Sequence, residues 1–179
     1  MRIPSIVLPA LAMSAIVVLS NVLVQHPLNA WLTWGAFSYP VAYFVTDVVN
    51  RASGPALARR VAWVGFAVGL ILSAVFAPVR IACASGTAFI VSQLLDVAVF
   101  NRLRQQSWWK APLFGSAAAS VVDTAIFFGV AFVGSGISWL HLAAGDLGVK
   151  LAMALVLLPP YRVLISRLTS PAAAPPRTA

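Results

Sequence analysis

The chain has 179 residues, of which 61% are hydrophobic and only 9% are charged, and its mean hydropathy is +0.93. Because a soluble domain carries about 25% charged residues, this composition excludes a soluble globular protein and indicates a single all-α integral membrane domain. The net charge of +8 comes from short basic clusters between apolar segments, which is typical of membrane-protein loops and not of a nucleic-acid-binding face.

Six apolar segments are long enough to cross about 30 Å of hydrocarbon as helices. They cover residues 3–24, 31–49, 61–79, 81–100, 111–133 and 142–161. The first follows Arg2 like a signal peptide, but its apolar stretch exceeds the roughly 7–15 residues of a signal core, so we expect a retained helix. The sequence thus predicts a polytopic membrane protein with six transmembrane helices over residues 1–170, and a disordered cytoplasmic tail over residues 171–179.

The basic residues fall mainly on one side of these segments. Ten of the twelve lie before the first segment or after the second, fourth and sixth, whereas Arg80 and Lys150 fall toward the other side. The ten are Arg2, Arg51, Arg59, Arg60, Arg102, Arg104, Lys110, Arg162, Arg167 and Arg177. Because loops rich in Lys and Arg stay in the cytoplasm, this pattern predicts a multi-pass protein surrounded by lipid, with both termini cytoplasmic.

The second segment contains a proline close to its start. Pro40 ends the run Phe-Ser-Tyr-Pro at residues 37–40, and we expect this run to interrupt the helix, since a proline removes a backbone donor. At membrane depth such an interruption is tolerated only beside protein or water. Asp47 and Asn50 follow one turn apart. The alternative is that Pro40 simply begins the helix and that Asp47 lies at the headgroups beside Arg51.

The fourth segment carries polar groups within an apolar run. At about 100° per residue, Ser85, Ser92 and Asp96 fall within roughly 40° of one another on a helix, and Gln93 lies on the flank of that face. A carboxylate near the middle of a bilayer costs about 2.5–3.5 kcal/mol on insertion scales. Such a group normally faces protein or a wet cavity, so this face is predicted to be a polar binding surface.

The fifth segment repeats this arrangement. Ser116, Ser120, Asp123 and Phe127 share one face of a helix, with Thr124 on its edge. The serines either contact a ligand or form hydrogen bonds between helices, and the sequence does not separate these two roles.

The sixth segment places Asp146 and Lys150 one turn apart, where the two charges can neutralise each other. Alternatively, Asp146 lies outside the membrane and Lys150 reaches the interface with its long side chain. Arg80 is either a partner for Asp96 and Asp123 or a loop cation on the outer face.

The sequence does not indicate an enzyme, a metal centre or a bound cofactor. It contains no His-Glu-x-x-His, Gly-x-Ser-x-Gly or glycine-rich phosphate-binding motif. His26 and His141 are far apart in the chain, and the single cysteine, Cys83, excludes a multi-cysteine metal site. We therefore expect no catalytic residue.

A carrier fits the polar residues better. Carboxylates and amides can pair with a planar ligand edge that is rich in N–H groups. The polar set comprises Asp47, Asn50, Ser92, Gln93, Asp96, Asp123 and Thr124. The aromatic residues that could stack on such a ligand are Phe37, Tyr39, Phe100 and Phe127. This combination favours a purine-like solute over a sugar or an ion.

Several runs of the chain resemble the queuosine precursor transporters of the vitamin uptake transporter family. They are TWGAFSYP at residues 33–40, TD at 46–47, GPALARR at 54–60, QLLDV at 93–97, FNRLRQ at 100–105 and SVVDT at 120–124. Further similarity lies at residues 108–112 and 150–161, and the resemblance covers about residues 21–168. One departure is the short third connection, where Ala77 and Pro78 lead almost directly to Arg80.

The resemblance implies a six-helix inner-membrane protein that imports 7-cyano-7-deazaguanine, and also the aminomethyl base, for queuosine synthesis in tRNA. The polar positions that it carries over are Asp47, Gln93, Asp96, Asn101, Asp123 and Lys150. On this hypothesis Asp96 and Asp123 bind the base edge, Gln93 and Asn101 assist, and Lys150 or Arg80 balances the carboxylates.

Two rival functions remain at this stage. The first is a substrate-binding subunit of an ATP-driven vitamin importer, which would dock on its partner through small residues such as Ala10, Ser14 and Ala15. The second is a membrane enzyme that uses the aspartates. Whether the chain forms a homodimer is left open.

Overall fold

The computed structural model describes residues 6–136 and 138–169, apart from the side chains of Leu72 and Thr169. These residues form seven α-helices and no β-strand beyond one isolated bridge between Pro27 and Thr33. The helices are α1 (Val7–Leu23), α2 (Gly35–Ser53), α3 (Pro55–Phe76), α4 (Val79–Leu103), α5 (Lys110–Phe132), α6 (Trp139–Val156) and α7 (Leu158–Thr169). The predicted all-α class is confirmed.

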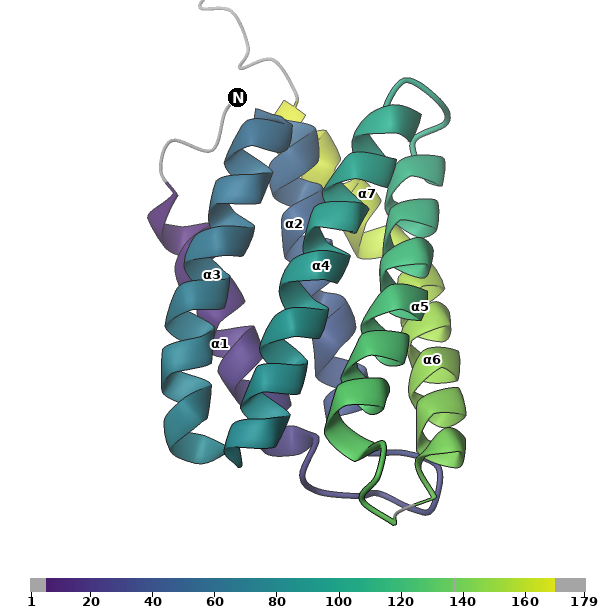
Figure 1. Cartoon of the computed structure of the whole chain (residues 1–179). Coiled ribbons are helices and arrows are strands. Elements are labelled where there is room, and N and C mark those ends of the chain that lie inside the picture. Colours follow the sequence, from purple (N-terminus) through teal and green to yellow (C-terminus); the bar gives the residue numbers. More distant parts are fainter. Residues whose placement is uncertain (1–5, 137, 170–179) are drawn as a thin grey trace, which may run out of the picture.

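The helices lie side by side along one axis, and α1 to α5 alternate in direction (Figure 1). The last pass along the bundle is made by α6 and α7 together. Helix α2 contacts each of the other six described helices. It is therefore enclosed by protein along its length, which explains how it can carry Asp47, Asn50 and Arg51.

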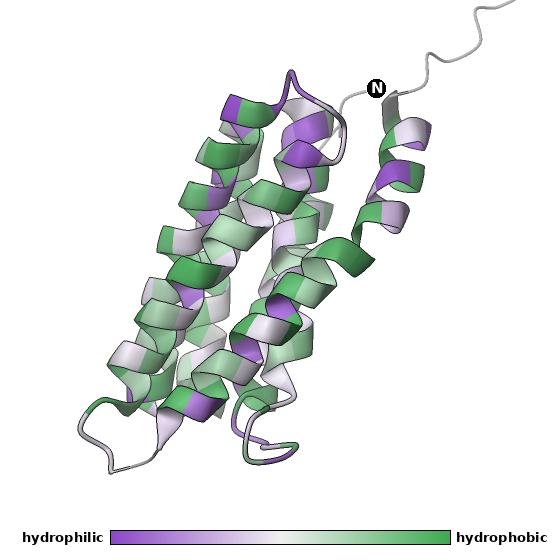
Figure 2. Cartoon of the chain, turned by 90° about the vertical axis from the view of Figure 1, so that its right-hand side faces the viewer, coloured by the Kyte–Doolittle hydropathy of each residue, from purple (hydrophilic) through white to green (hydrophobic). Residues whose placement is uncertain are grey.

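Four of the described helices, α3 to α6, are long and apolar enough to cross a membrane, and α1 is a shorter apolar helix. Helix α2 falls below that hydropathy because of its polar residues. Large apolar side chains such as Leu8, Ile71 and Leu140 stay exposed on the outer faces of the bundle. Hydrophobic residues make up much of each helix between the two ends of the bundle, as the green parts of the ribbon in Figure 2 show. These features are those of a polytopic membrane protein.

The predicted continuous helix over residues 142–161 is wrong. Helix α6 already begins at Trp139 and ends at Val156, and α7 starts at Leu158 as a separate helix. Pro159 and Pro160 follow the break, and neither has an N–H to donate to the preceding turn. The tail after residue 169, together with Arg2 and Arg177, lies outside the described residues.

The predicted interruption at residues 37–40 is also wrong. Helix α2 begins at Gly35, and it continues through Pro40 to Ser53. Pro40 and the preceding Tyr39 are buried against neighbouring helices, so the carbonyl that Pro40 leaves without a donor lies beside protein.

The connections at the two ends of α3 are short. Gly54 joins α2 to α3 with a φ of 92°, a backbone conformation that glycine adopts without strain, and Pro55 then begins α3. At the other end Ala77 and Pro78 lead directly into α4, as the sequence indicated.

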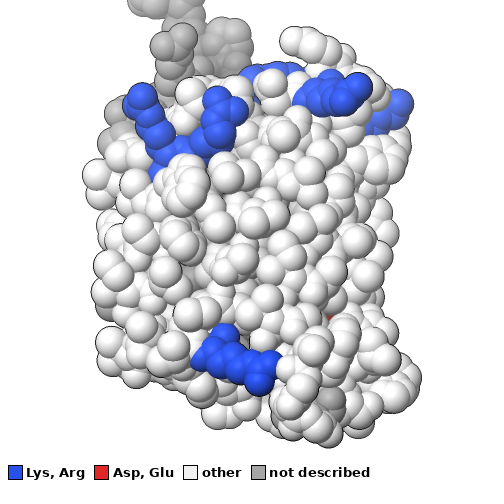
Figure 3. Space-filling view, viewed as in Figure 1, with Lys and Arg blue, Asp and Glu red and all other residues white. Residues whose placement is uncertain are grey.

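Charge is distributed unevenly over the surface. On the face shown in Figure 3, Lys and Arg gather at the end where α3 begins and α4 ends, and a smaller group lies at the opposite end. The band between them is almost free of charge. The inner faces of the helices hold the acidic residues.

Candidate functional site

All four acidic residues of the chain are buried. The exposed fractions are 2% for Asp47, 0% for Asp96, 1% for Asp123 and 5% for Asp146, and the sequence contains no other Asp or Glu. An ionised carboxylate in such surroundings is costly unless it is paired. The groups that pair with these carboxylates therefore determine which of them are satisfied within the protein and which are left for a ligand.

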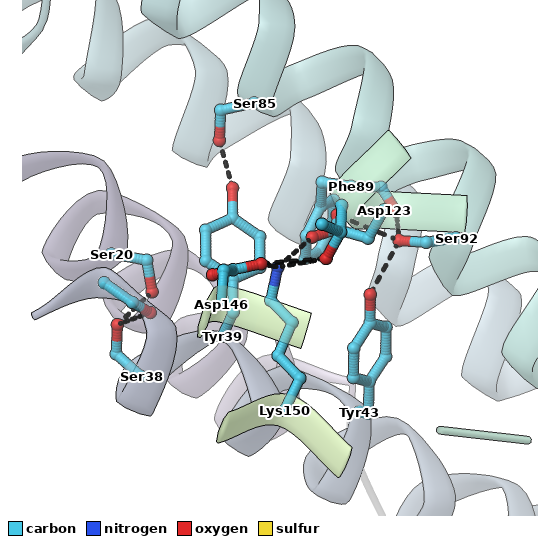
Figure 4. A network of polar contacts seen from close by, with 12 residues as sticks. Ser20, Ser38, Tyr39, Tyr43, Ser85, Phe89, Ser92, Asp123, Asp146 and Lys150 are labelled. Atoms are coloured by element: carbon cyan, nitrogen blue, oxygen red, sulfur yellow. Dashed lines mark hydrogen bonds and ion pairs between the residues drawn. The ribbon is translucent and has the colours of Figure 1, made fainter. Parts of the chain in front are cut away.

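Two of the four carboxylates share one lysine. Lys150 Nζ lies 2.7 Å from Asp123 Oδ2 and 2.5 Å from Asp146 Oδ2, and its side chain is 2% exposed (Figure 4). Thr124 Oγ1 donates to Asp146 Oδ2 at 2.8 Å. The predicted pairing of Asp146 with Lys150 is confirmed, and both side chains are buried within the bundle.

Two tyrosines of α2 extend this cluster toward α4. Tyr43 donates to Ser92 Oγ at 3.0 Å, and Ser92 Oγ lies 3.4 Å from Asp123 Oδ1. Tyr39 is hydrogen-bonded to Ser85, and its ring lies 5.3 Å from the Lys150 ammonium (Figure 4). Ser85 and Ser92 thus join helices, and both oxygens of Asp123 are engaged within the protein.

Arg80 does not balance any of these carboxylates. It donates to the carbonyl of Val130 at 3.0 Å and to that of Val133 at 2.5 Å, at the exposed end of α5. A guanidinium at this position satisfies helix-terminal carbonyls that have no intrahelical donor. The prediction of Arg80 as a counter-charge is wrong, and Lys150 has that role.

The other two carboxylates meet α5 at consecutive residues. Asp47 Oδ2 accepts from Ser116 Oγ at 3.3 Å, and a Cβ added at Gly115 would lie 2.6 Å from Asp96 Oδ1. A side chain at position 115 would displace the Asp96 carboxylate from this place against the α5 backbone. Neither aspartate forms an ion pair among the described residues.

Several buried polar atoms beside Asp47 and Asp96 have no hydrogen-bond partner in the described part of the chain. They are both oxygens of Asp96, Gln93 Nε2, Asp47 Oδ1, Asn50 Oδ1, Ser120 Oγ and Arg51 Nη2. The remaining atoms of two of these side chains are bonded, since Gln93 Oε1 accepts from Thr46 at 2.6 Å and Asn50 Nδ2 donates to the Val97 carbonyl at 3.4 Å. Because unpaired buried polar groups cost free energy, this set is suited to a polar ligand.

A small pocket, with room for about one water molecule, lies between the two carboxylate clusters. Lys150, Asp47 and Ser116 line one part of it, and Leu157, Leu158 and Tyr161 line the part at the break between α6 and α7. Asp96 and Gln93 are not among its lining residues. In this conformation the unpartnered edge of α4 is therefore closed off from the pocket.

Two arginines close the basic end of the bundle. Arg51 donates to Tyr161 Oη at 3.1 Å and to the Arg104 carbonyl at 2.9 Å, and Arg104 donates back to the Arg51 carbonyl at 3.1 Å. The Arg51 guanidinium also lies 5.1 Å from the centre of the Phe100 ring. These bonds tie the ends of α2 and α4 to α7.

Most of the predicted site residues face the interior. The structure brings together Tyr39, Asp47, Asn50, Ser92, Gln93, Asp96, Asp123, Thr124 and Lys150, all of which are buried. Phe37 is 39% exposed next to Trp34, and Asn101 is exposed in the last turn of α4, so neither joins this set. Sequence reasoning missed Tyr43, Thr46 and Tyr161. The signal for Tyr43 was its helical spacing from Tyr39, and that for Thr46 was its spacing from Asn50 together with its place in the TD run of the resemblance.

Comparison with known proteins places this chain in a family. A family model described as "Putative vitamin uptake transporter" matches residues 33–79 and 72–164. The queuosine precursor transporter of Escherichia coli (strain K12) is 36% identical, over 83% of this chain and 81% of that protein. No solved structure matches the chain.

Two further relatives carry the name "Probable queuosine precursor transporter". The protein of Haemophilus influenzae is 34% identical over 75% of this chain, and that of Bacillus subtilis (strain 168) is 33% identical over 71% of this chain. The alignments cover 68% and 69% of these two proteins. The relatives are transporters and not enzymes, and the chain, as its resemblance predicted, belongs to the vitamin uptake transporter family.

Proposed function

We propose that this chain is an inner-membrane transporter that imports queuosine precursors for tRNA modification. Its substrate is 7-cyano-7-deazaguanine, with 7-aminomethyl-7-deazaguanine as a second substrate. The names of the relatives support the substrate class. The observation that carries the proposal is the unpartnered edge of α4, where Asp96 offers two acceptors and Gln93 one donor.

This edge complements a guanine-like base. Such a base presents a carbonyl acceptor followed by two N–H donors along one side. Gln93 Nε2 can donate to the carbonyl, and the Asp96 carboxylate can accept both N–H groups in parallel. An adenine-like edge has a different order of donors and acceptors, so it would leave the buried carboxylate partly unpaired.

The ion pairs of Lys150 with Asp123 and Asp146, and the pocket beside them, complete the proposed transport route for the base. Lys150, Asp123 and Asp146 hold α5 and α6 together beside the pocket, while Tyr39 and Tyr43 present aromatic surface from α2. We infer that the base enters between these helices, pairs with Asp96 and Gln93, and leaves through the basic end when the bonds of Arg51 and Tyr161 open.

We further propose six transmembrane passes with both termini in the cytoplasm, the sixth pass being made by α6 and α7. Reporter fusions after Gly54 and Gln105 are then expected to be cytoplasmic, because these positions lie among the basic loops. A fusion after Gly136, in the connection between α5 and α6, is expected to be periplasmic. A cytoplasmic reporter at Gly136 would overturn this topology.

A Gly115→Ala substitution tests the position of Asp96. The new Cβ would lie 2.6 Å from Asp96 Oδ1, so the carboxylate must move, and we expect the initial rate of base uptake to fall by about tenfold or more. Gly129→Ala on the same helix is the matched control, since nothing lies within 4 Å of its Cβ. Both changes raise helix propensity equally. Equal uptake by the two variants would refute the proposed position of Asp96.

The function itself is tested in two settings. In a host that cannot make the precursor, this chain as the sole importer should restore queuosine in tRNA at nanomolar to micromolar external base. Reconstituted alone in liposomes, it should exchange labelled base without ATP, and selectivity over adenine should reach about 100-fold, since an unpaired buried group costs a few kcal/mol.

The liposome experiment also addresses the importer-subunit rival. Ala10 and Ser14 are 7% and 6% exposed, so two of the three small residues expected on a docking surface offer little area for it. Exchange that begins only after an ATPase module is added would nevertheless favour that rival over a stand-alone carrier.

A further inference from the structure

The buried charges of the bundle do not balance. Four carboxylates and one ammonium lie inside it, and the ammonium of Lys150 is committed to Asp123 and Asp146. Asp47 and Asp96 therefore have no ion-pair partner among the described residues. Two carboxylates without an ion pair in a low-dielectric interior are unfavourable, so this pair favours the uptake of a cation.

The geometry makes these two residues one unit. Both carboxylates reach the same turn of α5, Asp96 at Gly115 and Asp47 at Ser116. Two negative charges at this one turn repel each other. Two carboxylates that share a site cannot both ionise readily, and one proton on the pair removes their repulsion.

We propose that the pair of Asp47 and Asp96 carries one proton into the cell with each base, so that transport is driven by the proton gradient. This inference rests on the proposed function and adds the source of energy that drives transport. Binding of the base requires Asp96 as a carboxylate, because only the ionised form accepts two N–H groups in parallel. The proton then resides on Asp47, whose Oδ1 has no partner among the described residues.

The surroundings of Asp47 also allow the proton to leave. The charged and titratable groups around it are Asp96 from α4, Arg51 and Tyr43 from α2, Lys150 from α6 and Tyr161 from α7, with Arg104 bonded to the backbone at Arg51. Arg51 lies one turn along α2, and its Nη2 has no partner among the described residues. It can compensate the charge of Asp47 once the base and the proton have been released.

The test uses the whole protein in liposomes with the membrane potential clamped at zero. A pH difference of one unit, acid outside, should drive about tenfold accumulation of labelled base through the wild-type protein, whereas a sodium gradient at equal pH should drive none. In a weakly buffered medium, added base should raise the external pH with about one proton taken up per base. In Asp47→Asn, any exchange of base that remains at equal pH should no longer lead to accumulation when the pH differs, and added base should move no proton.

Three results would contradict the coupling of base transport to protons. Accumulation driven by sodium, uptake with no proton movement, or pH-driven accumulation by Asp47→Asn would overturn the proposal. If Asp47→Asn does not fold, the proton count on the wild-type protein decides alone. Failure of the wild-type protein to exchange base at equal pH would instead refute the transport function, so the two failures are distinguishable.

Discussion

Replacement of Asp96 by Asn is expected to reduce base uptake by at least about 100-fold while the protein stays in the membrane at a near-normal level. The amide keeps the size of the side chain but offers one acceptor in place of two, and its NH₂ group would face an N–H of the base. Losing such a buried pairing costs a few kcal/mol, and 2.7 kcal/mol corresponds to about 100-fold. Initial uptake rates, normalised to the amount of protein in the membrane, measure the effect.

Stability should not fall in this variant, because neither oxygen of Asp96 has a partner to lose within the described residues. Removing a buried charge can even favour insertion into the membrane. Asn101→Ala, at an exposed position of the same helix, is the control and should transport normally. Normal uptake by Asp96→Asn would show that the base binds elsewhere.

The helical faces could be predicted from the sequence because they depend only on local geometry. The 3.6-residue period placed Ser85, Ser92 and Asp96 on one face of α4, and Ser120 and Asp123 on one face of α5, and all five are buried. The pairing of Asp146 with Lys150 followed from the same spacing. Each of these predictions concerns residues of one helix.

Contacts between residues of different helices could not be predicted from the spacing within one helix. Asp96 and Asp123 look equivalent in the sequence, since each follows a serine in an apolar run. Only the packing of α5 against α6 brings Lys150 to Asp123 and leaves Asp96 without a partner. Arg80 likewise had two carboxylates as candidate partners, but the carbonyls at the end of α5 are closer and exposed to solvent, so its charge need not be buried.

The helix ends were also predicted poorly. Asn101 follows Asp96 at a spacing of five residues, which turns it away from the interior in the last turn of α4, where no further helix covers it. Pro40 was expected to break α2, yet the six helices packed around α2 support it through that position. Pro159 and Pro160 do follow a break, because the last pass has protein on fewer sides.

Replacement of Lys150 by Met is expected to destabilise the protein by about 3–5 kcal/mol, because it leaves Asp123 and Asp146 buried without a counter-charge. The methionine has a similar length and is apolar, so the loss of packing is small. The midpoint of thermal unfolding in detergent, together with the amount of protein in the membrane, measures the effect. Lys110→Met, at a half-buried position in the basic end of the bundle, is the matched control and should change stability little.

A triple variant separates charge from packing. If uncompensated carboxylates cause the instability, adding Asp123→Asn and Asp146→Asn to Lys150→Met should restore most of the unfolding midpoint, because no charge then remains in the cluster. If lost packing causes it, the two further changes should leave the protein as unstable as Lys150→Met alone. A Lys150→Met variant that unfolds at the wild-type temperature would contradict both explanations, and it would mean that the two aspartates are neutral in the folded protein.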